Sequence, residues 1–404
     1  MTLYELIVES SRNGVALQDR SSGSMPAGHN GPYHDPETPV RNTGHWLILF
    51  LKAHEISGEQ DFADAAEKAL GYLMSLAARP YGAAFYHRNS SEKDQCNGLI
   101  GQAWTVEALA EAGRQLQSDK PLDLAREVFL QHNFDEEKGI WHRLAVEGND
   151  LPYDMTFNHQ LWFAAAGAMI DNRRSRLSTQ PKSKTDSSGP ISEVARRVER
   201  FLELLPDHFR IYSSGLIYHP LLIKFTFKEK IRDIRRMLLS RPSNRRAWRY
   251  KAIGYQLFNL YGFGLIHEQY PEHSFWEDRK FKKALKFIRS PGFLRSIDEN
   301  AYGYPYNPPG FEMAYTIEQF DLGRDPDSGS SFELGSEEER RRWVSRQVGR
   351  CYNPESGLMD LESEDPATQA ARLYEAARLK DLELEELSGE ELRPSEKEKR
   401  WYFQ

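Results

Sequence analysis

The chain has 404 residues, of which 39% are hydrophobic and 12% aromatic, so it can bury a sizeable core and is not a disordered polymer. Its 60 acidic residues outnumber its 53 basic residues, and the formal net charge of -7 gives no reason to expect nucleic acid as a partner. Cys96 and Cys351 are the two cysteines of the sequence, which argues against a disulfide framework and favours a reducing compartment.

The N-terminal stretch MTLYELIVESSRNG carries Glu5 and Glu9 and has no long apolar segment, so we do not expect a secretory signal. No apolar run in the sequence approaches the roughly 20 residues that a membrane-spanning helix needs. We therefore expect a soluble protein of the cytoplasm with no membrane span. The sequence leaves the oligomeric state open.

Six helical segments share one character, with small and aromatic residues on all sides and polar residues crowded at the N-terminal end. A helix that is apolar all round needs a shell of other helices around it, so we predict that these six are inner helices. They begin at Arg41, Asn97, Met155, Arg249, Pro309 and Asp365.

Amphipathic helices separate the inner ones, with apolar residues at helical spacing and charged residues on the opposite face. Five of them begin at Asp61, Pro121, Ile191, Glu277 and Ser336. The sixth outer helix is assigned to residues 380–400, although that stretch is charged and weakly periodic.

Short glycine-led turns follow the outer helices and read as brief extended segments that lead into the next inner helix. They begin at Gly82, Gly139, Gly215, Gly303 and Gly357. The repeated order predicts an all-α fold, an (α/α)6 toroid with short β-hairpins between helix pairs. We expect residues 1–404 to form a single domain, with a flexible loop at 175–190 and a basic insertion at 223–248.

The N-terminal ends of the inner helices should converge on one mouth of such a toroid, where their free N–H groups favour anions and hydroxyl-rich ligands. Amides, charged groups and aromatic rings gathered in one cleft suit a carbohydrate. The candidate substrate-binding residues are Arg41, Asn42, His45, Trp46, Asn97, Gln102, Asn158, His159, Arg249, Tyr255 and Tyr315.

One stretch, Asp154-Met-Thr-Phe-Asn158-His-Gln-Leu161-Trp-Phe-Ala164, resembles the Asp-x-x-x-Asn-x-x-Leu-x-x-Ala pattern of unsaturated glucuronyl and rhamnogalacturonyl hydrolases, in the six-hairpin glycosidase superfamily. The segment from Gly44 is similar to their first hairpin. The resemblance implies that Asp154 is a general acid/base. The family's second acidic residue would fall near Asp94, where the surrounding sequence departs from the pattern.

The segment CNGLIGQAW, from Cys96, is instead similar to a helix of N-acylglucosamine 2-epimerase-like proteins, and faintly to the C-x-G motif of lanthionine cyclases. Those cyclases need a zinc site of two Cys and a His. Because Cys351 lies at the end of an outer helix and not at an inner helix mouth, we expect no metal and no cofactor.

Glu312, at the fifth inner helix, is the candidate second carboxylate, with Asp94 as its competitor. Both Asp154 and Glu312 also have structural explanations, since acidic residues cap helices and favour their N-terminal turns. His87, His142 and His219 recur at like places in the turns, which favours a structural role but also offers the opposed histidines of an epimerase.

Three functions therefore remain open. The first is a glycoside hydrolase-like enzyme acting on an oligosaccharide, with uronic-acid-containing ones among the candidates, by general acid/base catalysis. The second is a sugar epimerase or isomerase with paired histidines. The third is a non-catalytic protein that binds glycans or serves their assembly.

Overall fold

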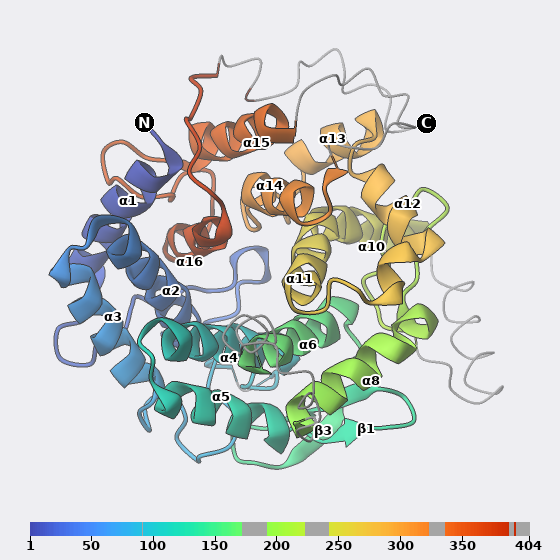
Figure 1. Ribbon diagram of the computed structural model, residues 1–404, viewed down its shortest axis with the longest axis horizontal. Helices are drawn as coiled ribbons and strands as arrows, with labels where there is room; N and C mark the ends of the chain where they lie inside the picture. The colour runs from blue at the N-terminus through green and yellow to red at the C-terminus, as the bar shows by residue number, and fades with distance from the viewer. Residues whose placement is uncertain (91, 172–191, 223–241, 323–335, 388–391, 393–404) are drawn as a thin grey trace, which may run out of the picture.

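The computed structural model describes residues 1–90, 92–171, 192–222, 242–322, 336–387 and 392. In this part of the chain, helices form two concentric rings, which confirms the predicted (α/α)6 toroid (Figure 1). The inner ring consists of α2 (Val40–Ser57), α4 (Gly98–Gln115), α6 (Phe157–Asp171), α11 (Gln256–Gln269), α14 (Pro309–Gln319) and α16 (Pro366–Ala371). The chain continues from α16 into the 3-10 helix η4 (Arg372–Arg378).

The outer ring consists of α1 (Leu3–Leu17), α3 (Gln60–Leu73), α5 (Asp119–Gln131), α8 (Glu193–His208), α12 (Arg279–Phe287) and α15 (Ser336–Cys351). Further helices lie in the connections, namely α10 (Pro242–Gly254), α13 (Pro291–Asp298), η1 (Gly31–Tyr33) and η2 (Ser274–Glu277).

The two rings differ in burial as the sequence pattern predicts. Every residue of α4 from Gly98 to Gly113 is buried, because this helix has neighbours on all sides. The outer helix α3 buries one face, through residues such as Phe62, Ala66 and Leu70, and exposes the other. Burial of these apolar faces stabilises the packed rings.

The prediction for the sixth outer helix was wrong. Residues 380–387 contain no helix, residue 392 is the one described helical residue of the predicted segment 380–400, and α1 occupies the outer position between α15 and α3 (Figure 1). Thr2 and Glu5 form a capping box that starts α1. Apolar and acidic residues alternate from Asp381 to Glu385, a period of two that suits extended backbone, and Leu3 N–H donates to Leu382 C=O (2.9 Å).

The turns between the helix pairs contain little regular sheet. One three-stranded antiparallel sheet joins β1 (Phe134–Asp135), β2 (Ile140–Leu144) and β3 (Asp150–Tyr153), with Phe134 opposite Trp141 and His142 opposite Tyr153. The predicted loop at 175–190 and most of the predicted insertion at 223–248 lie outside the described residues. The last residues of that insertion begin α10.

Glutamines of three inner helices form similar hydrogen bonds to the backbone of the turns. Gln160 accepts a hydrogen bond from Trp141 N–H (2.9 Å), donates to Trp141 C=O (2.8 Å), and also donates to the Asp154 carbonyl (3.1 Å). The turn backbone thus finds its partners in the core and does not remain unsatisfied. Related glutamine–turn contacts join Gln102 to Phe85 and Gln256 to Ile217.

None of the helices in the described ranges combines the length and the apolar composition that crossing a bilayer requires.

Candidate functional site

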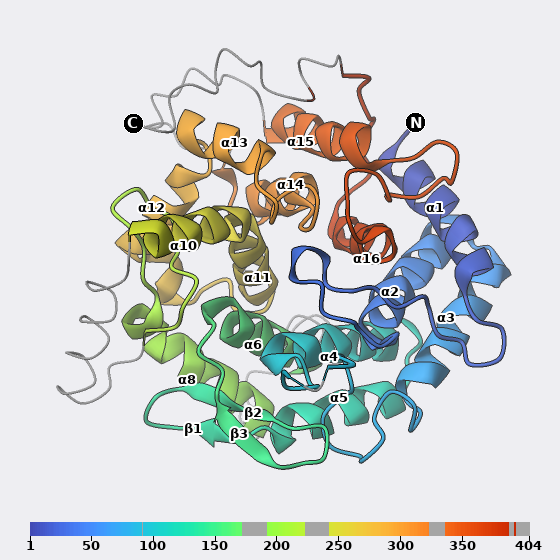
Figure 2. The ribbon, with the colours of Figure 1, turned by 180° about the vertical axis from the view of Figure 1, so that it is seen from behind.

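A cavity of about 210 Å³ lies where the N-terminal ends of the inner helices meet. Its walls come from the starts of α4, α6 and α11, from η4, and from the segment before α2, which crosses the centre of the ring in Figure 2. Four predicted substrate-binding residues line the cavity, namely Asn97, Asn158, His159 and Tyr255.

His159 and Asp154 form a hydrogen-bonded pair at the wall of this cavity. Nδ1 of His159 is 2.8 Å from Oδ2 of Asp154, and the His159 side chain is 24% exposed whereas that of Asp154 is 6% exposed. His159 is among the residues that line the cavity, and Asp154 lies behind it. The pair therefore presents an imidazole, and not a carboxylate, to a ligand.

The Asp154 carboxylate is held in an ionised state. Burial opposes the charge, but the His159 imidazole and the backbone N–H groups of Leu99 (3.0 Å) and Thr156 (3.1 Å) outweigh it, so the pKa of Asp154 lies below its usual value. An ionised carboxylate accepts the proton on Nδ1, which fixes the orientation of the ring and leaves Nε2 for the cavity.

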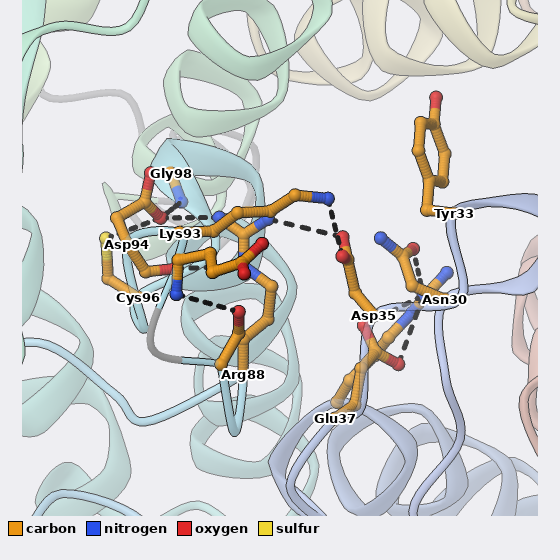
Figure 3. A network of polar contacts seen from close by, with 12 residues as sticks. Asn30, Tyr33, Asp35, Glu37, Arg88, Lys93, Asp94, Cys96 and Gly98 are labelled. Carbon is orange, nitrogen blue, oxygen red and sulfur yellow. Dashed lines mark hydrogen bonds and ion pairs between the residues drawn. The ribbon is translucent and has the colours of Figure 1, made fainter.

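Asp94 takes part in an ion-pair network next to this pair (Figure 3). Its carboxylate accepts from Arg88 (2.7 Å), Arg143 (2.7 Å) and the N–H of Gly98 (2.8 Å). Burial raises the pKa of Asp94, but Arg88 and the Gly98 amide outweigh it and lower the pKa to about 2. Asp94 is not among the residues that line the cavity.

Arg88 and Lys93 tie this network to the loop before α2 (Figure 3). Lys93 Nζ is 2.5 Å from one oxygen of Asp35, and Arg88 Nη1 is 3.5 Å from the other. The carboxylate of Asp35, which lines the cavity, is therefore already paired with two cations.

The opposite wall of the cavity is rich in tyrosine. The hydroxyl groups of Tyr33 and Tyr255 are hydrogen-bonded at 2.8 Å, and Tyr306 donates to Asn30 (2.7 Å). Aromatic faces with hydroxyl groups at their edges can stack on sugar rings and bond their hydroxyls.

Arg372 lies at the floor of the cavity and is 1% exposed. Its Nη2 is 2.5 Å from Glu375 and 3.4 Å from Glu312, while Nε and Nη1 have no hydrogen-bond partner among the described residues. Burial and the neighbouring Glu375 carboxylate raise the pKa of Glu312 well above its usual value. The predicted carboxylate Glu312 is thus a buried partner of Arg372 and does not itself line the cavity.

The remaining predicted site residues have other contacts. Arg41 lies behind the wall, where its guanidinium stacks on the Trp104 ring (4.1 Å), and Trp104 does line the cavity. His45 stacks on Tyr374 in the core, and Arg249 is exposed near Tyr212. The others are Asn42, which donates to Pro26 C=O, Trp46, which packs on Phe50, Gln102, which holds a turn, and Tyr315, which donates to Glu268.

Several cavity residues were not among the predicted site residues, above all Lys251, Arg372, Tyr33 and Asn30. One signal could have found the last two. The stretch HNGPYHDP, residues 29–36, is dense in turn-forming residues and lies shortly before the first inner helix, which favours a position near the mouth.

Charged and aromatic side chains contact one another across the ring beyond the cavity. Arg378 Nη2 is 3.0 Å from Glu107 of α4, and Nη1 is 4.0 Å from Glu268 of α11. Glu268 also accepts from Tyr315 of α14 (2.7 Å). These contacts join the middle of α4 to the C-terminal halves of α11 and α14.

Among the described residues, no group of three or more His, Cys, Asp or Glu side chains is placed to hold a metal ion. The chemistry that the cavity residues offer is hydrogen bonding, stacking on aromatic rings, attraction of anions and proton transfer by imidazole.

Comparison with known proteins agrees with this architecture. No protein-family model matches the chain. The archaeal glycosylation protein Q of Haloferax volcanii is 41% identical over 395 residues, which cover 95% of this chain and 99% of that protein.

Two solved structures share the fold. The cellobiose 2-epimerase of Bacillus thermoamylovorans has a TM-score of 0.57 at 13% identity, covering 93% of this chain and 98% of the enzyme. An unsaturated glucuronyl hydrolase specific for heparin has a TM-score of 0.52 at 12% identity, covering 92% and 96%. Both are toroids of the six-hairpin superfamily, which confirms the predicted resemblance.

Proposed function

Because the chain belongs to the family of the archaeal glycosylation protein Q, we propose that it is an enzyme of glycan metabolism that binds a sugar in the cavity and transfers protons with the Asp154–His159 pair. A glycan-related role is supported by that relative and by the carbohydrate enzymes that share the fold. The finer activity rests on the residues of the cavity.

The observation that carries the proposal is the placement of the two side chains, with the His159 imidazole at the cavity and the Asp154 carboxylate behind it. Asp154 holds Nδ1 of His159 at 2.8 Å, so Nε2 is free to take a proton from a ligand and return it. A general base must come within hydrogen-bond reach of the proton that it removes, and His159 lines the cavity.

A second imidazole supports isomerisation or epimerisation as the reaction class. His219 lines the same cavity, and burial together with the charge of Lys251 keeps its pKa well below the usual value. His219 is therefore neutral at neutral pH. In such a reaction one group removes the proton next to the carbonyl of the open-chain sugar, and the same or a second group returns a proton to that carbon or its neighbour.

Glycoside hydrolysis is the second candidate, because Asp94 and Asp154 bind consecutive amides at the start of α4. A hydrolase of the common type needs a carboxyl group at the glycosidic oxygen. Here the Asp94 and Asp154 oxygens are occupied by Arg88, Arg143, His159 and backbone amides. For this reason the imidazole pair is the better supported choice.

Incubation with oligosaccharides in D₂O separates the candidates. The panel holds neutral and uronic-acid-containing disaccharides, and proton NMR follows the sugar signals. Isomerisation or epimerisation through a carbon acid places deuterium on carbon and yields a new sugar isomer, whereas hydrolysis yields new reducing ends without exchange at carbon.

His142→Gln is the matched control for His159→Gln and His219→Gln. His142 occupies the same place in its turn as His219, but it contacts the Leu151 carbonyl and is not among the cavity residues. We expect exchange to be lost in the two cavity variants and kept in the control. New reducing ends without exchange would favour the hydrolase, and sugar binding with neither reaction would make the protein a non-catalytic binder.

A further inference from the structure

Lys251, near the end of α10, extends its ammonium group into a cage of tyrosine rings. Nζ is 4.6 Å from the ring centre of Tyr33, 5.7 Å from that of Tyr255 and 5.7 Å from that of Tyr302. The three rings belong to different segments of the chain, and Lys251 lines the cavity described above. Ring faces attract a cation but do not neutralise its charge.

This ammonium group has no carboxylate partner in the described part of the chain. The one carboxylate in the cavity lining, Asp35, contacts Lys93 and Arg88 instead. The hydroxyl of Tyr33 is engaged with that of Tyr255. A mostly buried cation without a counter-ion costs free energy, so its position is unfavourable unless a ligand completes it.

The charges around Lys251 are of the same sign. Burial and the nearby Lys93 ammonium lower the pKa of Lys251 to about 8, which leaves it mainly charged at neutral pH. The cavity lining holds Arg88, Lys93, Lys251 and Arg372 against Asp35 alone, although the chain as a whole is acidic. Arg88 and Arg372 are also paired with Asp94 and Glu375 behind the wall, so Lys251 is the lining cation without a carboxylate among the described residues, and its charge attracts an anion.

We propose that Lys251 binds the acidic group of the sugar ligand, a carboxylate or a phosphate, while the surrounding tyrosines pack against the sugar ring. This rests on the proposed function only in taking the ligand of the cavity to be a sugar. Lys251 then decides between acidic and neutral sugars, because only an acidic sugar supplies the missing counter-ion.

Binding measured by calorimetry, without turnover, tests this on the full chain. The probes are methyl glucuronide, methyl glucoside and methyl glucoside 6-phosphate. We expect at least one charged probe to bind about tenfold or more tighter than the glucoside, and Lys251→Met to abolish that preference while glucoside affinity stays within about twofold. The charged probe that wins identifies the group as carboxylate or phosphate.

Lys52→Met is the matched control, since Lys52 also lies over a tyrosine ring (Tyr4, 4.8 Å) but is paired with Glu55 and is not among the cavity residues. It should leave the preference intact, and Lys251→Arg should keep part of it. Thermal unfolding checks that Lys251→Met is folded. Removing an unpaired buried charge should not lower its stability.

The inference fails if no charged probe is preferred, which includes the absence of binding, or if Lys251→Met keeps the preference. It can fail while the proposed function stands, if Lys251→Met keeps the preference for a charged probe and the exchange at carbon that depends on His159 is still observed in D₂O. Conversely, a preference that depends on Lys251 in a protein without turnover would support the inference and reject the proposed enzyme.

Discussion

Asp94 and Asp154 bind neighbouring amides of one helix start, Asp94 accepting from Gly98 N–H at 2.8 Å and Asp154 from Leu99 N–H at 3.0 Å. Two segments about sixty residues apart thus converge on the N-terminus of α4, where the partial positive charge favours carboxylates. The position of His159 depends on this arrangement, because Asp154 is its hydrogen-bond partner.

Gly98→Ala should damage both stability and the site. Gly98 has φ +59°, and a Cβ there would lie 2.4 Å from Oδ2 of Asp154 and 3.0 Å from Nδ1 of His159. We expect a loss of about 2–4 kcal/mol in the free energy of unfolding from backbone strain and steric overlap, together with a fall in activity. Urea titration and the exchange assay measure the two effects.

Gly71→Ala in α3 is the control for this change. A Cβ at Gly71 meets nothing within 4 Å, and its backbone is helical. It should raise stability by about 0.5–1 kcal/mol and leave activity alone. If Gly98→Ala and Gly71→Ala changed the free energy of unfolding and the activity equally, the close contact at Gly98 would be contradicted.

Asp154→Asn and His159→Gln should have similar effects, because the two side chains act as a unit. We expect each to lower kcat by about 10²–10⁴-fold with little change in sugar affinity, and the double variant to be no worse than either single one. Steady-state kinetics and calorimetry give the two quantities. If the fold-losses in kcat of the two single variants multiplied in the double variant, the residues would act separately.

The Gln160→Leu variant should have a lower free energy of unfolding, because Gln160 bonds the turn backbone and is not a predicted contact of the ligand. The change removes the partners of the Trp141 N–H and C=O groups and of the Asp154 carbonyl. Buried backbone groups left without partners should cost about 2–5 kcal/mol in total. Gln60→Leu is the control, since Gln60 bonds only the exposed Asp64 (2.8 Å), and it should change stability by less than about 0.5 kcal/mol.

Affinity for an acidic sugar should depend on pH through Lys251, whose pKa in the free protein is lowered to about 8. The charged form binds the anion, so affinity should be constant below that pH and fall by up to about tenfold per pH unit above it. Tyr33, Tyr255 and His219 keep one state in this window, because burial places the pKa values of the two tyrosines well above 10 and that of His219 well below 6.5.

Calorimetry between pH 6 and pH 10 checks this dependence. Lys251→Arg should be flat over the range, because a guanidinium keeps its proton. The stability of the unliganded protein should move the other way, since the unfolded chain binds the Lys251 proton more tightly, and unfolding should become harder as the pH rises from about 8 towards 10.5. If the affinity of wild type stayed constant from pH 6 to pH 10, as expected for Lys251→Arg, Lys251 would not be the group that binds the anion.

The fold was predictable because the two rings differ in burial pattern. Segments such as α4 and α6 are apolar on all sides, and segments such as α3 and α5 on one face, so periodicity separates inner from outer helices. The sixth outer helix was missed because α1 comes first in the chain and closes the ring next to segments that come last. Periodicity does not report which distant segments pair.

The site was predictable only in its location. Polar residues at inner helix starts do surround the cavity, but Asn158 lines it while Asn42, at a like position, turns to the Pro26 carbonyl. Which side chain faces the axis depends on how each helix is rotated in the packed ring. Lys251 and Arg372 reach the cavity by the same packing, and no local pattern marks them.

The Arg378 contacts with Glu107 and Glu268 cross the ring from α4 to α11, at a deeper level than the cavity residues of those helices. We expect these contacts to obstruct the axis, so that under the proposed function only a terminal sugar unit reaches His159 and the rest of the chain stays outside the mouth. We then expect product to leave by the way the substrate came, without sliding from one unit to the next. The enzyme would then work on chain ends, one encounter at a time.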